Sequence, residues 1–314
     1  MSKQIPLFDA SDEAITRQPL EPIPPAKDGT PPEQWLGGVH PDGFLELTRG
    51  FYLYADQLNR ALHFLAHDRA KDQALYQQLV TATGMSKAQV EAYMQHATAM
   101  QLLAPRKLVP TPFGYHILES DPFFDQPGTL WLLHYFIASN PGIVVWNYLC
   151  NAILPSVEQI SPVEARDQFL PFSGRWSESS IRVKVRKELR AIFADYTAEF
   201  FARLDYLREE ERNEYLVNHH VTPVPPFILL AAVLIYRDRF MPGASSVEIA
   251  TLVYAEHSPG RILRQNELKI RQALNTLHES RWLTIESRAN LDQIRFRSNV
   301  SWLDAVLAYW ESAA

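Results

Sequence analysis

One helical pattern occurs twice in this chain, 180 residues apart, and it constrains the fold more than any other feature of the sequence. One copy begins at Ser86 and the other at Asn266, and both are common helix N-cap residues. In each copy small or apolar residues follow after four, eight and eleven positions, and a bulky apolar pair follows after sixteen and seventeen. This spacing predicts a helix with one buried stripe that leads into a strand. The pattern is typical of the second helix of a helix-turn-helix.

The sequence around these helices predicts a winged helix-turn-helix at both ends of the chain. In the first copy, an amphipathic segment over 73–84 ends at a glycine just before Ser86, and a short basic turn over 104–107 lies between two apolar pairs. In the second copy, segments of alternating polarity over 282–286 and 293–297 predict a longer wing hairpin. Each module would present the outer face of its second helix to a DNA groove.

Between the two modules the chain has helical periodicity and is rich in aromatic residues. The acidic stretch over 205–214 predicts a solvated helix end or a linker, and prolines over 221–226 predict a nearby domain boundary. We therefore expect a mainly α fold in which two winged helix-turn-helix modules with small β-wings flank a central helical region. The predicted domains are a proline-rich flexible arm over 1–39, an N-terminal winged-helix-like module over 40–120, a central helical region with a basic helix over 121–217, and a C-terminal winged-helix module over 218–314.

The composition predicts a globular protein. Hydrophobic residues make up 46% of the chain, and the longest apolar run, over 227–236, is about half of the roughly 20 residues that a membrane-spanning helix needs. The N-terminus has no basic head followed by an apolar stretch, so we expect a cytoplasmic protein. The single cysteine, Cys150, is expected to be a small buried hydrophobe. A net charge of −6 argues against a protein that coats nucleic acid over its whole surface.

The segment over 175–190 is the most basic in the chain, with six bases and two acids. A helix that starts after Ser177 has an apolar stripe made of Ile181, Val185, Leu189, Ile192 and Tyr196. The rest of this helix carries the candidate phosphate contacts Arg182, Lys184, Arg186, Lys187 and Arg190. Several such contacts would give DNA binding that weakens steeply with salt. The alternative is an ordinary solvated charged face.

The outer face of the Asn266 helix has polar residue types that donate to phosphates or contact base edges. The candidate nucleic-acid contacts on and beside this helix are Arg264, Gln265, Lys269, Gln272 and Asn275, and those on the wing are Arg288, Arg295 and Arg297. The alternative is that this module is a packing unit or a docking surface for another protein.

The outer face of the Ser86 helix is nearly neutral. Its expected outward residues are Lys87, Gln89, Glu91, Tyr93, Gln95 and Thr98, and the turn after it adds Arg106 and Lys107. Phosphate binding is driven by charge neutralisation and counterion release, so this face predicts weak DNA affinity or a protein partner. Lys87, Arg106 and Lys107 are its candidate nucleic-acid contacts.

No motif in the sequence indicates catalysis or a cofactor. The chain has no phosphate-cradling glycine loop, no dinucleotide fingerprint and no nucleophile elbow. His63 and His67 stand four residues apart beside Asp68, which is the spacing of a two-histidine metal clip, but no third ligand is evident nearby. We expect no metal, no cofactor and no enzyme activity; an enzyme with an unrecognised site is the remaining alternative.

The segment Gln126-Pro-Gly-Thr-Leu-Trp-Leu-Leu-His134 resembles the bacterial family known as domain of unknown function 4007. The turn Thr111-Pro-Phe-Gly114 precedes it and Trp146 follows it, and Ser177-Glu-Ser-Ser-Ile181 is similar to the middle segment of the family. The resemblance runs from about His40 to the C-terminus, although the family's His-Glu pair before a Phe lacks its Glu here. Members are often encoded near DNA sulfur-modification and phage-defence genes, so the resemblance implies a DNA-linked accessory role and no established activity.

Two functional hypotheses follow from these features. The leading hypothesis is a non-catalytic DNA-binding accessory protein of a bacterial DNA-modification or phage-defence system, which contacts duplex DNA through the C-terminal winged helix and the basic helix. The alternative is a protein-binding adapter whose winged-helix modules assemble partner subunits. The acidic net charge and the near-neutral Ser86 helix favour the adapter.

Overall fold

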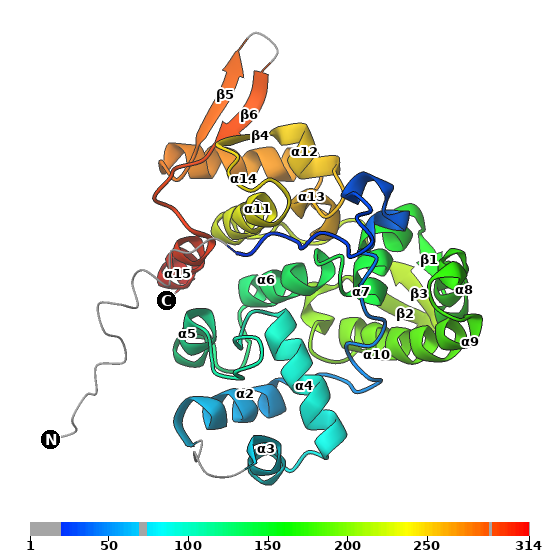
Figure 1. Ribbon diagram of the computed structural model, residues 1–314. Helices are drawn as coiled ribbons and strands as arrows, with labels where there is room; N and C mark the ends of the chain where they lie inside the picture. The colour runs from blue at the N-terminus through cyan, green and yellow to red at the C-terminus, as the bar shows by residue number, and fades with distance from the viewer. Residues whose placement is uncertain (1–19, 69–73, 289–290, 314) are drawn as a thin grey trace, which may run out of the picture.

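The computed structural model describes residues 20–68, 74–288 and 291–313 (Figure 1). Its main helices are α2 (Ala55–His63), α3 (Leu75–Thr83), α4 (Lys87–Ala99), α5 (Pro112–Ser120), α6 (Pro127–Ala138), α7 (Val144–Tyr148), α8 (Pro162–Asp167), α10 (Arg186–Thr197), α11 (Pro226–Phe240), α12 (Ile249–Tyr254), α13 (Pro259–Ile262), α14 (Glu267–Glu279) and α15 (Trp302–Ala313). Among the described residues, no helix is both long and apolar enough to cross a membrane.

Two antiparallel three-stranded sheets make this a mixed α/β protein, so the prediction of a mainly α fold with two flanking winged helix-turn-helix modules is wrong. The first sheet has the strand order β1-β3-β2 and consists of β1 (Gln159–Ile160), β2 (Leu207–Glu211) and β3 (Glu214–Val217). The second has the order β4-β6-β5 and consists of β4 (Ser246–Glu248), β5 (Thr284–Arg288) and β6 (Leu291–Arg295).

The first sheet lies in the region that we predicted to be helical. Strands β2 and β3 replace the helix end or linker expected over 205–214, and Asn213 at their turn has a left-handed backbone with φ 64°. Tyr215 and Val217 are buried on one face of β3, while the acidic residues of β2 face solvent. The segment is therefore an amphipathic hairpin. Its first strand is almost entirely charged, so the alternation of buried and exposed residues on the second strand was not recognised in the sequence.

The predicted wing of the first copy is absent. Residues 102–110 form one isolated bridge, between Leu103 and Pro110, instead of a two-stranded hairpin. Arg106 and Leu108 have positive φ angles of 65° and 47°, and proline has no N–H for a ladder. Because extended strands need negative φ, this turn cannot continue a hairpin.

Helix α4 is also more enclosed than a recognition helix would be. Tyr93, which we expected to face outward, is 1% exposed. Its hydroxyl donates to the carbonyl oxygen of Tyr52 and accepts from the N–H of Tyr54, at 3.0 and 2.8 Å. These bonds hold the segment before α2 against α4, so this side of the helix is an internal contact.

The second copy has a three-stranded sheet where the sequence predicted a two-stranded wing. Helix α14 begins after Asn266, whose side chain accepts from the N–H of Lys269. The hairpin of β5 and β6 is present, but β6 also pairs with a third strand, β4. The result is a three-stranded sheet next to α14 and α12 (Figure 1).

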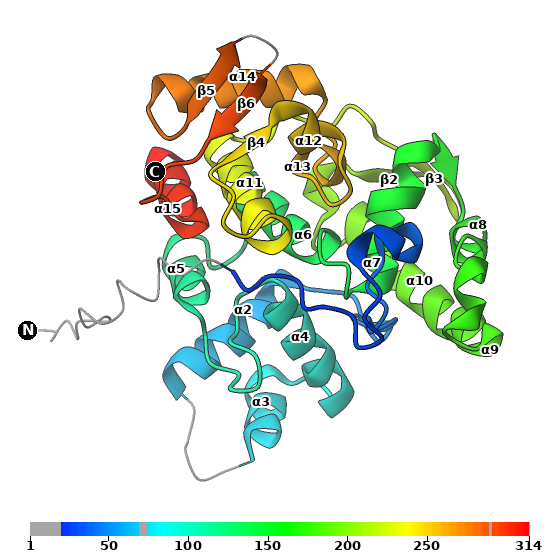
Figure 2. The ribbon, with the colours of Figure 1, turned by 45° about the horizontal axis from the view of Figure 1, so that its top comes forward.

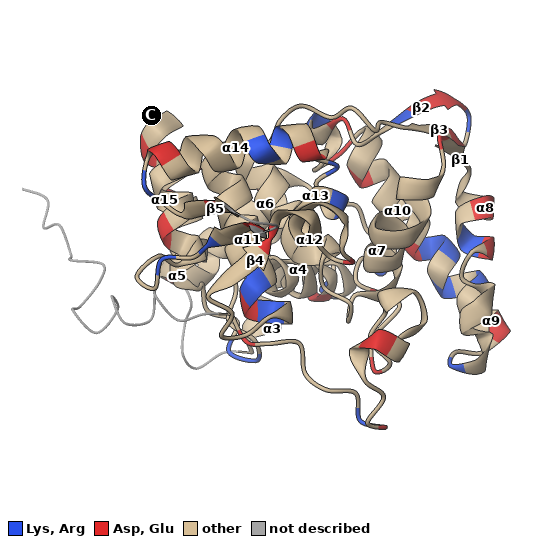
Figure 3. Cartoon of the chain, turned by 90° about the horizontal axis from the view of Figure 1, so that it is seen from above, with Lys and Arg blue, Asp and Glu red and all other residues tan. Residues whose placement is uncertain are grey.

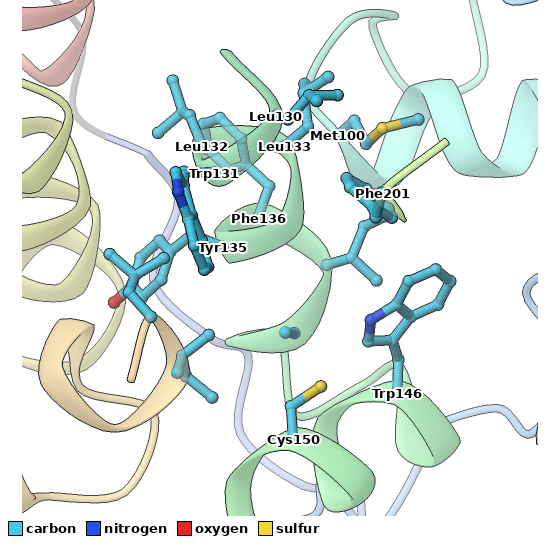
Figure 4. Close-up of a cluster of buried hydrophobic side chains, with 14 of the residues drawn as sticks. Met100, Leu130, Trp131, Leu132, Leu133, Tyr135, Phe136, Trp146, Cys150 and Phe201 are labelled. Atoms are coloured by element: carbon cyan, nitrogen blue, oxygen red, sulfur yellow. The ribbon is translucent and has the colours of Figure 1, made fainter. Parts of the chain in front are cut away.

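The core surrounds α6, which runs through the middle of the molecule (Figures 1 and 2). Every residue from Gly128 to Ala138 is buried, so this helix is enclosed on all sides. Trp146, Cys150 and Phe201 come from other elements and lie around it (Figure 4). Cys150 is buried and makes no disulfide, as expected for a small core residue.

Part of the proline-rich arm lies along α11. The N–H of Leu20 donates to Asp238 Oδ2, and the N–H of Ile23 donates to the carbonyl oxygen of Arg239, both at 3.2 Å. The remainder of the predicted arm, residues 1–19, lies outside the described residues.

Candidate nucleic-acid interface

The basic helix is a continuous run of α9 (Glu178–Ser180), a π-turn η7 (Ile181–Val185) and α10. Ser177 caps it, since its hydroxyl accepts from the N–H of Ser180 at 3.2 Å. The predicted apolar stripe is fully buried and comprises Ile181, Val185, Leu189, Ile192 and Tyr196. The cations of this helix lie on the side of the molecule opposite α15 (Figure 3).

Two of the five outer cations form ion pairs within the protein. Arg182 Nη2 lies 2.6 Å from Glu178 Oε1, one turn earlier, and Lys184 Nζ lies 2.8 Å from Glu46 Oε2. The two basic side chains are still 53% and 47% exposed. Exposed ion pairs contribute about 0–1 kcal/mol and are screened by salt, so a phosphate can displace these carboxylates at little cost.

The other three cations are not in ion pairs with any residue that the structure describes. Arg186, Lys187 and Arg190 are exposed, and the Arg190 guanidinium lies 5.8 Å from the centre of the Tyr52 ring. The acid of this stretch, Glu188, is buried on the inner face. Every exposed charge on η7 and the first turn of α10 is therefore positive.

The inner face of the same helix carries two buried carboxylates that the sequence analysis missed. Glu188 Oε1 accepts from the N–H groups of Leu47 and Thr48, both at 2.8 Å, and its Oε2 accepts from the Thr48 hydroxyl at 2.7 Å. Asp195 Oδ1 accepts from the N–H of Leu53 at 3.0 Å. These bonds fix the segment before α2 to the basic helix. Glu188 lies next to the apolar stripe in the helical period, and from this position its burial could have been predicted.

Glu188 gives the protein a pH-dependent stability. Burial raises the pKa of Glu188 from 4.5 to about 7, against the hydrogen bonds from Thr48 and Leu47, which lower it. The folded state therefore binds this proton more tightly than the unfolded state, and the stabilisation is complete below about pH 4.5 and lost as the pH rises through 7. We expect wild-type protein to lose on the order of 3 kcal/mol between pH 5 and 8 relative to Glu188→Gln.

Denaturant unfolding of both proteins at the two pH values measures this difference. Burial also raises the pKa of Asp195, and the charge of Glu188 raises it further. The effect of burial is common to both proteins, so the difference between them reports Glu188 and its charge on Asp195. Parallel pH dependences of wild type and variant would contradict the assignment to Glu188.

Three predicted contacts of the C-terminal copy are used inside the protein. Arg264 and Gln265 are 8% and 4% exposed. Arg264 Nη1 donates to two main-chain carbonyl oxygens at 2.7 and 2.8 Å, the Gln265 side chain accepts from a main-chain N–H at 3.2 Å, and Lys269 Nζ donates to a carbonyl oxygen at 2.6 Å. These partners lie between Tyr206 and Val224. The three side chains hold α14 to the middle of the chain and do not form an exposed basic surface.

The remaining predicted contacts of this copy are scattered. Those that are exposed are Gln272, Asn275, Arg295 and Arg297. Arg295 pairs with Glu286, with Nε 2.7 Å from Oε1. The side chain of Arg288 lies outside the described residues.

The surface around α14 has mixed charge and an apolar part. Arg271 forms ion pairs with both Glu267 and Asp292. Leu268 and Tyr254 are 65% and 62% exposed beside them, and the Tyr254 hydroxyl donates to Glu267 at 3.0 Å. One cation between two acids, next to exposed apolar side chains, fits a protein partner better than a phosphate backbone.

The predicted contacts of the first copy are exposed. Lys87 stands at the start of α4, and Arg106 and Lys107 lie on the turn after it. Leu108, just after this turn, lines one cavity, and Lys184 of the basic helix lines a neighbouring one. The two cavities share three lining residues, so folding brings this turn near the basic helix.

The motif behind the family resemblance has a structural place in the core. Trp146 Nε1 donates to the Tyr196 hydroxyl at 2.6 Å, and that hydroxyl lies 2.7 Å from His134 Nδ1. His134 Nε2 lies 3.1 Å from the carbonyl oxygen of Ile262. Because a carbonyl only accepts, Nε2 carries the proton and Nδ1 accepts from Tyr196. Burial lowers the pKa of His134 to about 3, so this histidine is a neutral link in a closed network.

The two histidines with metal-clip spacing form an exposed pair. The rings of His63 and His67 are 4.7 Å apart, and His63 Nδ1 lies 3.6 Å from Asp68 Oδ2. Within the ranges 20–68, 74–288 and 291–313, no group of three or more His, Cys, Asp or Glu side chains is placed to hold a metal ion.

Comparison with known protein families shows which family this chain belongs to. The family model described as protein of unknown function (DUF4007) matches residues 50–309. The chain belongs to this family. The family resemblance noted in the sequence is thereby confirmed.

Two solved structures have the same fold as this family member. The "Magnesium ion-bound SspB crystal structure" is 18% identical, with a TM-score of 0.71, and the "SspB crystal structure" is 19% identical, with a TM-score of 0.68. Both alignments cover 86% of this chain and 88% of the other. No curated protein matches the chain in sequence.

Proposed function

We propose that this protein is a non-catalytic DNA-binding accessory protein that works in the cytoplasm of bacteria, in a DNA-modification or phage-defence system. The observation that carries the proposal is the outer face of the basic helix. Five cations lie between Arg182 and Arg190, and the acid within that stretch is turned inward. Such a face follows a phosphate backbone and releases counterions when it binds.

The gene neighbourhoods implied by the family resemblance support the same setting. The resemblance implies a place beside DNA sulfur-modification and phage-defence genes. The proposed partners are duplex DNA and the other proteins of such a system. The proposed DNA surface is limited to the basic helix, because Arg264, Gln265 and Lys269 near α14 bond to the main chain inside the protein. The cations Arg271 and Arg295 are paired with acids.

The proposal predicts a charge-specific loss of duplex affinity. The triple variant Arg186→Ala, Lys187→Ala, Arg190→Ala removes three phosphate contacts, each of which contributes about 0.9 to the slope of log K against log salt. We expect duplex binding to weaken about 100-fold near physiological salt and the slope to flatten by about 2.7. Fluorescence anisotropy on a labelled duplex over a range of salt concentrations measures both quantities.

A matched control removes the same charge elsewhere. The variant Lys27→Ala, Arg208→Ala, Arg212→Ala loses three exposed cations from other elements. It should keep the wild-type salt slope, because distant exposed charges are screened. If both triple variants lose the same duplex affinity, the loss comes from the lower net charge and not from the basic helix. An unchanged salt slope in the first variant would overturn the proposal.

A second candidate function is a protein-binding adapter. The surface around α14 favours it, since Leu268 and Tyr254 are largely exposed beside the ion-paired Arg271, Glu267 and Asp292. Replacing Leu268 and Tyr254 with Ser should abolish co-purification with the products of neighbouring genes if this surface binds them. Retained co-purification would exclude this surface as the adapter site.

A further inference from the structure

Two cavities form one groove between α4 and the basic helix. The larger has a volume of about 680 Å³ and the smaller about 370 Å³, and both are lined by Phe44, Arg49 and Gln95. The segment that contains Phe44 and Arg49 passes between α4 and α10 (Figures 1 and 2). Clefts of this size take nucleotide-sized ligands and are too small for a duplex.

Aromatic side chains from three separate elements line this groove. Phe44 belongs to the segment before α2, Tyr76 to α3, and Trp176 precedes α9. Phe44 and Tyr76 are 46% and 37% exposed, so both rings are open to a ligand in the groove. Exposed rings along a groove are the surface on which unpaired bases stack.

The groove also contains an unsatisfied hydrogen-bond acceptor. The Oε1 atom of Gln95, which lines both cavities, is buried and has no hydrogen-bond partner among the described residues. A buried amide oxygen without a donor costs free energy. If the Gln95 side chain rotates so that this oxygen faces the cavities, an exocyclic amino group of a base, as in adenine or cytosine, is a donor that satisfies it.

Charge divides the groove into a floor and a rim. Arg49 pairs with Glu91, and Lys184 pairs with Glu46, so each cation that lines the cavities has an acid beside it. Two cations without an ion pair among the described residues lie just outside: the Lys187 side chain packs against Gly50, next to Arg49, and Arg106 stands two residues before Leu108 in the wall. A neutral aromatic floor with a cationic rim suits a nucleotide whose base enters while its phosphates stay at the edge.

We propose that this groove binds unpaired nucleotides of a DNA strand, next to the duplex held by the basic helix. The inference rests on the proposed DNA-binding function and adds its substrate class: DNA with a single-stranded segment or an extruded base. A partner peptide is the competing occupant, and the experiment below distinguishes the two.

The test compares two labelled probes, a blunt duplex and the same duplex with a single-stranded dA tail. Because base–aromatic stacking contributes about 1–3 kcal/mol per base, wild-type protein should bind the tailed probe about tenfold more tightly. Phe44→Ala and Tyr76→Ala should remove this gain and leave blunt-duplex affinity unchanged. Tyr254→Ala, which removes an exposed ring elsewhere, should keep the gain. Circular dichroism and thermal unfolding establish that all variants fold.

The outcomes separate this inference from the proposed function. Wild-type protein that binds both probes equally, as it would if the groove takes a peptide, overturns the inference, and so do groove variants that keep the tenfold gain. If blunt duplex does not bind but a dA oligonucleotide binds and depends on Phe44 and Tyr76, the duplex proposal fails and the groove proposal stands.

Discussion

Gly114→Ala should destabilise the protein by about 3 kcal/mol or more, because a Cβ at this position overlaps the carbonyl oxygen of Leu102. Gly114 lies in the first turn of α5, and its N–H donates to the Thr111 hydroxyl at 3.0 Å. Leu102 is fixed as well, since its carbonyl oxygen accepts from the N–H of Thr111 at 3.0 Å. A clash between two main-chain segments cannot be relieved by rotating a side chain, so the start of α5 has to move.

Gly174→Ala is the matched control for this substitution. A Cβ at Gly174 meets no atom within 4 Å, and its backbone does not have positive φ. We expect a change of about 1 kcal/mol or less, since alanine also reduces the entropy of the unfolded chain. Urea or guanidinium unfolding of the two variants measures both values. Equal midpoints would show that the Leu102 contact does not constrain α5.

Tyr196→Phe should cost about 3 kcal/mol, because it leaves two buried groups without partners. The lost hydroxyl accepts from Trp146 Nε1 at 2.6 Å and lies 2.7 Å from His134 Nδ1. Water cannot replace it without space in the core, and Trp146, His134 and Tyr196 are all fully buried. The ring itself is kept, so the loss measures the hydrogen-bond network and not a cavity.

Tyr148→Phe provides the comparison for the network. Tyr148 packs its ring against Phe169 and Phe172, and its hydroxyl has no hydrogen bond to any described residue. Removing that hydroxyl should change stability by about 0.5 kcal/mol or less. If thermal and denaturant unfolding rank the two variants equally, the Tyr196 hydroxyl does not hold α6 to the basic helix.

The basic helix connects the proposed function to the architecture. Its outer side carries the proposed phosphate contacts, while Glu188 and Asp195 on its inner side hold the segment that lines the groove. A change that weakens the Glu188 contacts is therefore expected to disturb the groove as well as stability. The neutral Glu188→Gln variant keeps an acceptor for the N–H groups and serves as the conservative comparison.

The sequence by itself determined those features that depend on neighbouring residues along the chain. The caps at Ser86, Asn266 and Ser177 and the apolar stripes behind them follow from the helical period, and the structure has helices there. The family was also recognisable from a continuous motif, Gln126 to His134. Local periodicity specifies which side of a helix is buried, because burial of one face is what makes that period favourable.

Only the tertiary structure decided what the exposed and polar residues do. The pairing of Ile160 with Tyr215 built a sheet in a region with helical periodicity, and the contacts of Arg264, Gln265 and Lys269 removed them from the surface. Strand pairing and charge pairing depend on residues that meet only after folding, so their partners leave no periodic trace in the sequence. The positions of these partners left the basic helix as the exposed cationic face of the fold.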